Sequence, residues 1–534
     1  MKKFTKLIAL MLVLCMFASL ALACNSTEEP TEAPTETESS TNKGTSKPTS
    51  KPTSKPTSTS KPTADPVPEG FQVTDFYELL DYNGGDFDED MIDIGQGSYM
   101  YVVKNTNEEE YEEFKEQLYD AGCYPYTTYE EGNHKFATFI TKYQIIHTML
   151  LHYNYDEDDT VNYGNKSAKD HYEVRIMEDD RAMFGLAGLE EENVYEEEYG
   201  GLFMMLSDDA DYWPGRCGFL YQLADGSFFI IDGGTDKVNA GGGLPAQTLM
   251  NVLTEHAPDP NNIVIAGWLF THIHEDHVGA FWDISTNSAW VDKIHIEKVI
   301  YNMPNDDEMA IQDKYHWSDG SATSATGGVT ARGRQFDAAV EKFAPDQIIK
   351  AHSGMQFFLR DLTLTIDVTQ DTILYSTDIT LSREANIESI NWHNSTSVVT
   401  RVDYKGKTAI YLGDTHQISV KNTITPLFRT IYGDCEIVQT AHHGYGDTAA
   451  NILYKYLDVE MVLWPVYRQH LQGLNPDGSY YPNQESQYGG VIYYDFNKNL
   501  TKDGIKQIIT LKNWCVVCDD FDTWEFYEKD YVPN

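Results

Sequence analysis

The stretch IVIAGWLFTHIHEDHVG at residues 263–279 runs from an unbroken apolar segment directly into three histidines and two carboxylates. The apolar residues 263–270 predict a buried β-strand, and the polar residues after them predict a loop at its end. Histidine supplies 16 of the 534 residues, so the spacing His-x-His-x-Asp-His is unlikely to arise by chance. Imidazole and carboxylate bind zinc and its first-row neighbours, and the loop therefore predicts a metal site.

The spacing within this loop suggests how two ions are shared. His272 and His274 occupy alternate positions and can face one ion. Asp276 and His277 come at the start of the helix expected next, where they can face a second ion. A lone histidine would normally be an ordinary core or surface residue, but the density of ligand types here favours metal binding.

Three other segments carry residues that complete such a site. FFIIDGG at 228–234 is an expected strand and turn that places Asp232 below the metal loop. TAIYLGDT at 408–415 is another strand that ends in glycine and Asp414, and one aspartate can bridge two ions. AHHG at 441–444 supplies His442 and His443. Each segment alone is a weak signal, because Asp-Gly is a common turn and paired histidines are often incidental.

Together and in this order, the segments resemble the metallo-β-lactamase superfamily. The resemblance implies an α/β fold, an αββα sandwich of two sheets packed face to face with helices outside and a metal pair at one edge. It also implies a role for each matching residue: His272 and His274 on the first ion, Asp276, His277 and His443 on the second, Asp414 on both, and Asp232 as a supporting residue.

One departure from the superfamily concerns the first ion. Many members add a third histidine from a Gly-His-Thr-like segment, which this chain lacks. The corresponding region, NWHNSTSVV at 391–399, resembles the branch that contains the hydrolase domain of competence-type DNA-uptake proteins and the teichoic-acid phosphorylcholine esterases. His393 is a further candidate ligand, with a structural role beside the supporting residue Asn394 as the alternative. His352 is assigned a structural role.

These residues predict a dinuclear-metal hydrolase with two divalent ions, zinc first and manganese or iron as alternatives. Two ions can acidify a bridging water, so we expect cleavage of a phosphoester by metal-bound hydroxide. Hydrolysis of a lactam, lactone or thioester is the second hypothesis, and a non-catalytic surface-binding lipoprotein is the third.

Asp276 and His442 are the predicted catalytic residues, His442 as a substrate contact or proton carrier. Trp464, Tyr467, Arg468 and His470 either shape the substrate groove or are plain surface residues.

The N-terminal region indicates export. Lys2, Lys3 and Lys6 precede an apolar run that ends at residue 23, as in a signal peptide, with an uncleaved membrane anchor as the alternative. Small residues before Cys24 resemble a bacterial lipobox, which predicts lipidation at Cys24. Residues 24–68 form a Thr/Ser/Pro/Lys-rich segment without apolar residues, expected to be a disordered spacer. We therefore expect a protein lipid-anchored on the extracellular face of a bacterial membrane, or secreted.

The remainder is expected to form two domains, a small α/β module of unknown role at 69–200 and the hydrolase domain at 201–534. In the module, strands are predicted near 99–103, 134–140, 144–153 and 172–177, and a helix at 108–121. DIGQG at 93–97 imitates a first-strand signature of the superfamily, but an ordinary turn is the better interpretation. DEDD at 156–159 is predicted to be a solvated hairpin loop.

The formal net charge of −44 bears on partners. Its long-range field disfavours nucleic acid and other polyanions unless a local positive patch intervenes. The expected substrate is a small-molecule or cell-wall-polymer phosphoester. A phosphorylcholine-type or neutral-headed phosphodiester is expected to be a better substrate than DNA, and its ammonium could sit on Trp464 or Tyr467.

Overall fold

The computed structural model describes residues 82–155, 162–163, 166–167, 170–189, 199, 201–206, 217–235, 245–305, 308–310, 328–376, 393–445, 448, 450–466, 497–509, 514–518 and 529–530. Residues 65–534 belong to one compact unit. The predictions for the signal region, Cys24, the spacer, residues 156–159, Tyr467, Arg468 and His470 lie outside the described residues. Among the residues that are described, no helix is long and apolar enough to cross a membrane.

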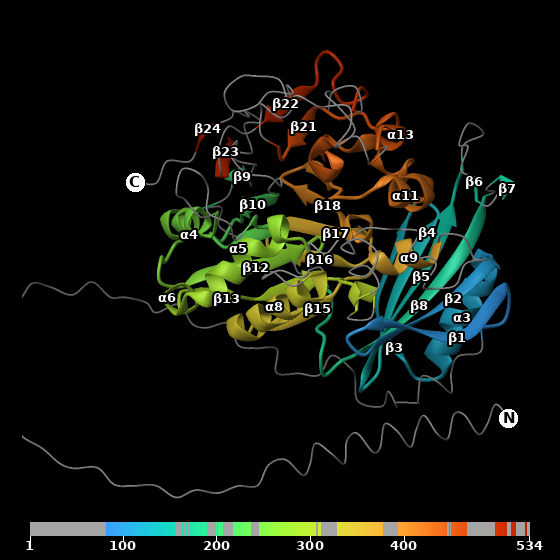
Figure 1. Cartoon of the computed structure of the whole chain (residues 1–534). Helices are drawn as coiled ribbons and strands as arrows, with labels where there is room; N and C mark the ends of the chain where they lie inside the picture. The colour runs from blue at the N-terminus through green and yellow to red at the C-terminus, as the bar shows by residue number, and fades with distance from the viewer. Residues whose placement is uncertain are drawn as a thin grey trace, which may run out of the picture. The chain divides into compact units, whose positions relative to one another are not determined.

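The first part of the described chain is a six-stranded antiparallel sheet (Figure 1). Its order is β1 (Asp86–Gly95), β2 (Ser98–Thr106), β8 (His171–Asp180), β5 (Gln144–Tyr153), β4 (His134–Ile140) and β3 (Tyr124–Glu131). A two-stranded ribbon, β6 (Asn162–Tyr163) and β7 (Lys166–Ser167), lies beyond β5 in the sequence. Helix α3 (Glu108–Asp120) buries Tyr111, Phe114 and Leu118 against one face of the sheet.

The four predicted strands and the helix are confirmed, whereas β1 and β3 were missed. β1 has the acidic sequence DFDEDMIDIG, and β3 contains a proline, so neither has the apolar pattern of a central strand. Both are edge strands, where charge and proline are tolerated. The prediction of a turn at 93–97 is confirmed: Gln96 and Gly97 have φ of 56° and 77° and join β1 to β2.

The second sheet contains the strand of the metal loop. Its order is β15 (Gln347–Lys350), β14 (Lys298–Tyr301), β12 (Ile263–Phe270), β11 (Phe228–Asp232), β10 (Gly218–Gln222), β9 (Phe203–Leu206), β23 (Trp514–Cys518) and β24 (Lys529–Asp530), with β13 (Ile294–Ile296) also paired to β12. Strands β11, β12, β14 and β15 are parallel. Their carboxyl ends therefore meet at one edge.

The third sheet supplies the remaining site segments. Its order is β16 (Gln356–Leu359), β17 (Leu362–Val368), β18 (Val399–Tyr404), β19 (Lys407–Tyr411), β20 (Ile437–Gln439), β21 (Met461–Trp464) and β22 (Lys506–Ile509). β16 to β19 are antiparallel, and β19 to β22 are parallel. The ends of β19 and β20 lead to Asp414 and to the histidine pair.

The second and third sheets pack face to face. Ala266 and Leu269 of β12 enter the core between these sheets, while Trp268 and Phe270 face the helices outside. On that outer side lie α4 (Pro245–His256), α5 (Glu275–Thr286), α6 (Ser288–Val291) and α8 (Gly328–Phe343). The third sheet is covered by α9 (Gln370–Ser376), α11 (Gln417–Ser419), η3 (Val420–Ile424), α12 (Thr425–Phe428) and α13 (Asn451–Tyr454), which share a core with the first sheet.

Buried polar groups join the first sheet to the rest of the unit. Both ring nitrogens of His352 lie 2.9 Å from a carboxylate, Asp179 of β8 on one side and Asp371 of α9 on the other. Burial opposes its protonation, but these carboxylates raise the pKa of His352 to about 9. The Lys350 ammonium donates to the carbonyls of Ile94 and Gly95 at 2.7 and 2.8 Å. His352 therefore has structural contacts, and residues 82–189 are packed through ionic contacts as well as apolar ones.

Candidate metal centre

The two inner sheets bring the predicted ligands to one edge. Thr271 to His274 follow β12, Asp414 follows β19, and His443 lies in the short helix η5 (Ala441–Gly444) after β20. Helix α5 begins at Glu275, so Asp276 and His277 lie in its first turn as predicted. Acidic residues are favourable there because the helix N-terminus carries partial positive charge.

The structure gathers these residues into two groups that share Asp414. His272, His274 and Asp414 offer ligand atoms within 4.8 Å of one another, and so do Asp276, His277, Asp414 and His443. His277 Nε2 lies 3.2 Å from Asp414 Oδ2, and His443 Nε2 lies 3.5 Å from the same oxygen. Two ions with one bridging carboxylate are the arrangement that this geometry suits.

Hydrogen bonds behind the ligands orient two of the imidazoles. His277 Nδ1 donates to Asp232 Oδ2 at 2.7 Å, and His443 Nδ1 donates to the carbonyl of Pro465 at 2.7 Å. Asp232 also accepts from the backbone N–H and the hydroxyl of Thr271, both at 2.8 Å. Since Nδ1 carries the proton in both histidines, Nε2 is the atom left to bind a metal.

The buried nitrogens themselves test whether metal fits. The Nε2 atoms of His272, His277 and His443 are buried and make no hydrogen bond. The Oδ1 atom of Asp414 is also buried without a hydrogen bond. Polar atoms left in this way are costly in a protein interior. Their convergence on one space is explained by a metal pair, whose bonds would take the place of the missing hydrogen bonds.

Burial and charge set the protonation of the ligands. Burial lowers the pKa of His272 and His274 well below the usual range, aided by neighbouring imidazoles, so both are neutral as metal binding requires. Burial also opposes protonation of His443, but Asp414 and Asp276 raise its pKa to about 10, so a metal ion would displace a proton from its Nε2 atom on binding. Cys217 lies within 4.8 Å of Asp232 and His277, and burial raises the pKa of its thiol.

His393 lies beside the first group of ligands. It begins the short helix η2 (His393–Thr396), its side chain is buried, and its ring centroid is 5.7 Å from that of His274. The position is compatible with a third imidazole on the first ion. Asn394, next to it, donates from Nδ2 to His442 Nε2 at 3.1 Å and to His416 Nε2 at 3.4 Å.

His416 was not singled out in the sequence. Its ring centroid lies 4.9 Å from that of His442, so the two imidazoles form a pair on the third-sheet side of the site. The sequence did contain a clue to His416, which lies two residues after Asp414. A histidine so close to a predicted bridging ligand is expected at the end of the same strand. His442 is 15% exposed, which leaves it accessible from solvent.

The backbone at the ligand loops adopts rare conformations. Asp232, His442 and His443 have φ of 57°, 45° and 55°, in the left-handed region that non-glycine residues seldom occupy. Such strain is concentrated at functional sites, where surrounding structure holds it. At Gly413 φ is 54°, and a Cβ would lie 2.8 Å from Ser397 Cβ, so the turn before Asp414 requires glycine.

The prediction of Trp464 as a groove residue is wrong. Its side chain is fully buried in the core beneath the third sheet, and its indole N–H donates to Gln507 Oε1 at 2.8 Å. Trp464 is the last residue of β21 rather than part of the loop after it. The strand was predicted to end at Leu463 and ends one residue later, so Trp464 is a buried strand residue rather than a loop residue.

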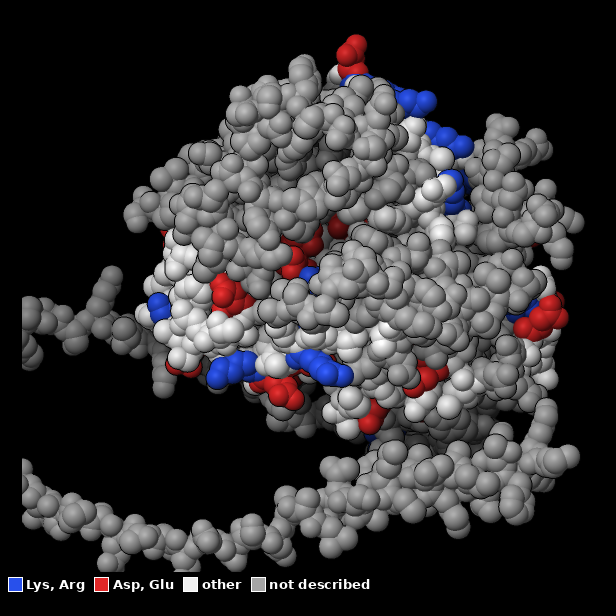
Figure 2. Space-filling view, viewed as in Figure 1, with Lys and Arg blue, Asp and Glu red and all other residues white. Residues whose placement is uncertain are grey.

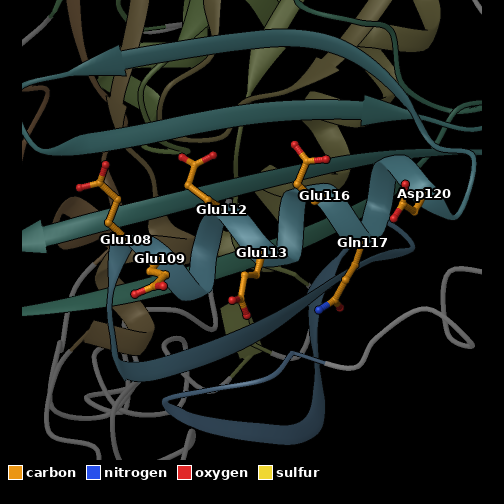
Figure 3. A pocket seen from close by; sticks show the side chains of 7 residues that line it. All are labelled: Glu108, Glu109, Glu112, Glu113, Glu116, Gln117 and Asp120. Atoms are coloured by element: carbon orange, nitrogen blue, oxygen red, sulfur yellow. The ribbon is translucent and has the colours of Figure 1, made fainter.

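Acidic residues also gather away from the metal ligands, on α3. Figure 3 shows them in two rows along the helix rather than converging on one point: Glu108, Glu109, Glu112, Glu113, Glu116 and Asp120. Lys135 forms ion pairs with Glu108 and Glu112 at 2.7 and 3.0 Å. Elsewhere basic and acidic side chains lie next to one another, as Figure 2 shows along one rim of the face in view.

No family model matches the sequence, and neither does any curated protein. Among solved structures, the chain is similar to CmlA, a diiron β-hydroxylase from Streptomyces venezuelae, at 12% identity and a TM-score of 0.29, covering 59% of this chain and 53% of that one. It is also similar to MEM-A1, a subclass B3 metallo-β-lactamase from a soil metagenome library, at 13% identity and a TM-score of 0.26, covering 50% and 85%. The chain thus spans about half the length of CmlA.

The arrangement of the layers and the position of the ligand groups identify the fold. Two mixed sheets pack face to face, helices cover both outer sides, and two ligand groups sharing Asp414 lie at the strand ends along one edge. The chain has the αββα metallo-β-lactamase fold.

Proposed function

We propose that this protein is a dinuclear-metal hydrolase that cleaves a phosphoester. The observation that carries the proposal is the sharing of Asp414 between two groups of buried ligands. When bound, a pair of divalent ions acidifies water and polarises the substrate oxygen, which suits in-line attack at phosphorus. Zinc is the first choice of metal, with manganese and iron as alternatives.

The chain's own residues have separable roles in this proposal. Asp276, His277 and His443 would hold one ion, His272 and His274 the other, and Asp414 both. Asp232 and the Pro465 carbonyl orient two of the imidazoles. His442 is partly exposed and lies 3.8 Å from Asp414, so it is placed to contact the substrate or to pass a proton to the leaving group.

Hydrolysis of a carbon-centred substrate such as a lactam, lactone or thioester is the second candidate. The observation in its favour is the position of His393 beside His274, since a fuller histidine set accompanies that chemistry in this fold. The resemblance to the branch with DNA-uptake and phosphorylcholine-esterase domains favours the phosphoester and stays a prediction. One fold supports many reactions, so the substrate cleaved decides between the two candidates.

A substrate panel with metal analysis tests the proposal. We expect full-length protein to hold close to two metal equivalents and to cleave bis(p-nitrophenyl) phosphate with a higher kcat/KM than p-nitrophenyl phosphate or nitrocefin. Activity should disappear with a chelator and return with metal. A metal-loaded protein that cleaves nitrocefin and neither phosphate ester would favour the second candidate, and a protein that binds no metal after reconstitution would remove the enzyme hypothesis.

We infer further that the substrate is a small or wall-polymer phosphoester with a neutral or cationic head rather than nucleic acid. The net charge of −44 slows the approach of a polyanion, and salt should partly relieve this effect. Comparison of duplex DNA with a phosphorylcholine ester at two ionic strengths tests the inference. Efficient DNA cleavage that weakens as salt rises would contradict it.

We also propose that Cys24 anchors the protein through lipid to the outer face of a bacterial membrane. A diacylglyceryl cysteine would supply the two chains that stable anchoring needs. Cys24→Ala is expected to convert a detergent-extractable membrane protein into one that is released or left unprocessed, as fractionation would show. If the variant loses its signal and still partitions like the parent, the lipidation proposal is wrong.

A further inference from the structure

The metal centre is open to solvent on one side. Of the six residues in the two ligand groups, His274 is partly exposed whereas the other five are buried. A substrate therefore approaches across His274. The side chains at this opening decide which charge the site accepts.

Arg332 of α8 contacts the metal loop. Its guanidinium Nη2 donates to Glu275 Oε2 at 2.8 Å, and Glu275 stands between His274 and Asp276 in the metal loop. Both side chains are 11% exposed, so the pair is largely enclosed but still reached by solvent. The ion pair therefore holds the guanidinium against a residue that has a candidate metal ligand on each side of it in the sequence.

The packing of α8 holds this guanidinium in place. Phe336, one turn further along, contacts the rings of Phe270 and Phe281 at centroid distances of 4.9 and 5.6 Å. Phe270 ends the strand before the metal loop, and Phe281 belongs to the helix after it. Helix α8 thus packs on the same elements that position the ligands. Because the helix and the ion pair with Glu275 already restrict the Arg332 side chain, little side-chain entropy is left to lose when an anion binds.

We propose that Arg332 is a substrate-contact residue that binds a non-bridging oxygen of an anionic phosphoester, with Glu275 fixing its orientation. Guanidinium presents several N–H donors in one plane, so it can keep its bond to Glu275 and donate others to a phosphate. The identity of the ligand as a phosphoester rests on the proposed function.

The test measures binding of inorganic phosphate to metal-loaded, full-length protein by calorimetry, with metal content determined for every variant. Arg332→Gln is expected to weaken phosphate binding about ten- to hundredfold, the effect of losing a hydrogen bond to a charged group, while two metal equivalents remain. Arg332→Lys should recover part of the affinity, because it keeps the charge and loses the planar geometry.

Arg334→Gln is the matched control, because it removes the same charge from an exposed position on the same helix. It should bind phosphate like the parent. The proposal is overturned if the parent binds no phosphate or if the parent and Arg332→Gln bind it equally. It is also overturned if Arg332→Gln loses metal, because Arg332 would then act on the metal loop. Phosphate binding that depends on Arg332 without turnover of any phosphate ester would instead reject the proposed function alone.

Discussion

Asp414→Ala is expected to reduce hydrolysis to the background rate and to lower the occupancy of both metal positions. Asp414 belongs to both ligand groups, and its Oδ2 atom lies 3.2 Å from His277 Nε2 and 3.8 Å from His272 Nε2. Removing it would leave two ions with fewer ligands and no carboxylate between them. The loss in kcat/KM should exceed the roughly 10²- to 10³-fold that accompanies removal of one charge-stabilising group.

Two comparison variants separate this bridging role from a general loss of stability. His443→Ala should mainly lower one metal equivalent, because His443 belongs to the second group alone. Asp403→Ala removes an aspartate from β18 that bonds to Thr408 and lies in neither group, so it should retain both equivalents. Metal analysis after dialysis reports the outcome. If Asp414→Ala loses a single equivalent and keeps the other at full affinity, Asp414 does not bridge.

His393→Ala is expected to weaken binding of the first ion about tenfold or more and to leave the second nearly unchanged. The reason is its buried position, 5.7 Å between ring centroids from His274, on the side of the site that otherwise offers two imidazoles. A third neutral imidazole would complete a set of four protein ligands with Asp414. Titration with a competing chelator would give the two affinities separately.

The matched control for this experiment is His416→Ala. His416 contacts His442 and the Asn394 side chain, and it is in neither ligand group. It should keep both metal affinities whatever it does to turnover. A His393→Ala protein with parental metal affinity and a lowered thermal midpoint would show that His393 is structural, as a buried imidazole next to Asn394 could be.

Residues 82–189 are attached to the rest of the unit by charge as well as by apolar packing. Arg401 of β18 donates to Asp367 and to Glu131 of β3, and Arg429 donates to Asn154 Oδ1 at 2.9 Å. With His352 between Asp179 and Asp371, these contacts join edge and central strands of the first sheet to elements around the third. Whether the chain divides near residue 200 into two domains stays a prediction.

The sequence by itself determined most of what depends on local pattern. The run 263–279 predicted both the strand β12 and the loop after it, since a buried strand is marked by continuous apolar residues and a metal loop by its ligand density. The same holds for β11 before Asp232 and for β4 and β5, which match their predicted bounds. Ligand types at fixed spacing need no knowledge of distant contacts.

The tertiary structure decided what depends on neighbours far away in the chain. Burial of Trp464 follows from the length of β21, and the place of Arg332 follows from packing of α8 on α5, neither of which local sequence records. The position of His393 beside His274 and the pairing of His416 with His442 arise only when two sheets meet at one edge. His416 and His442 are 26 residues apart in the chain, and His274 and His393 are 119 apart. Contacts over such separations are set by sheet order and layer packing, and the periodicity of a single segment carries no information about either.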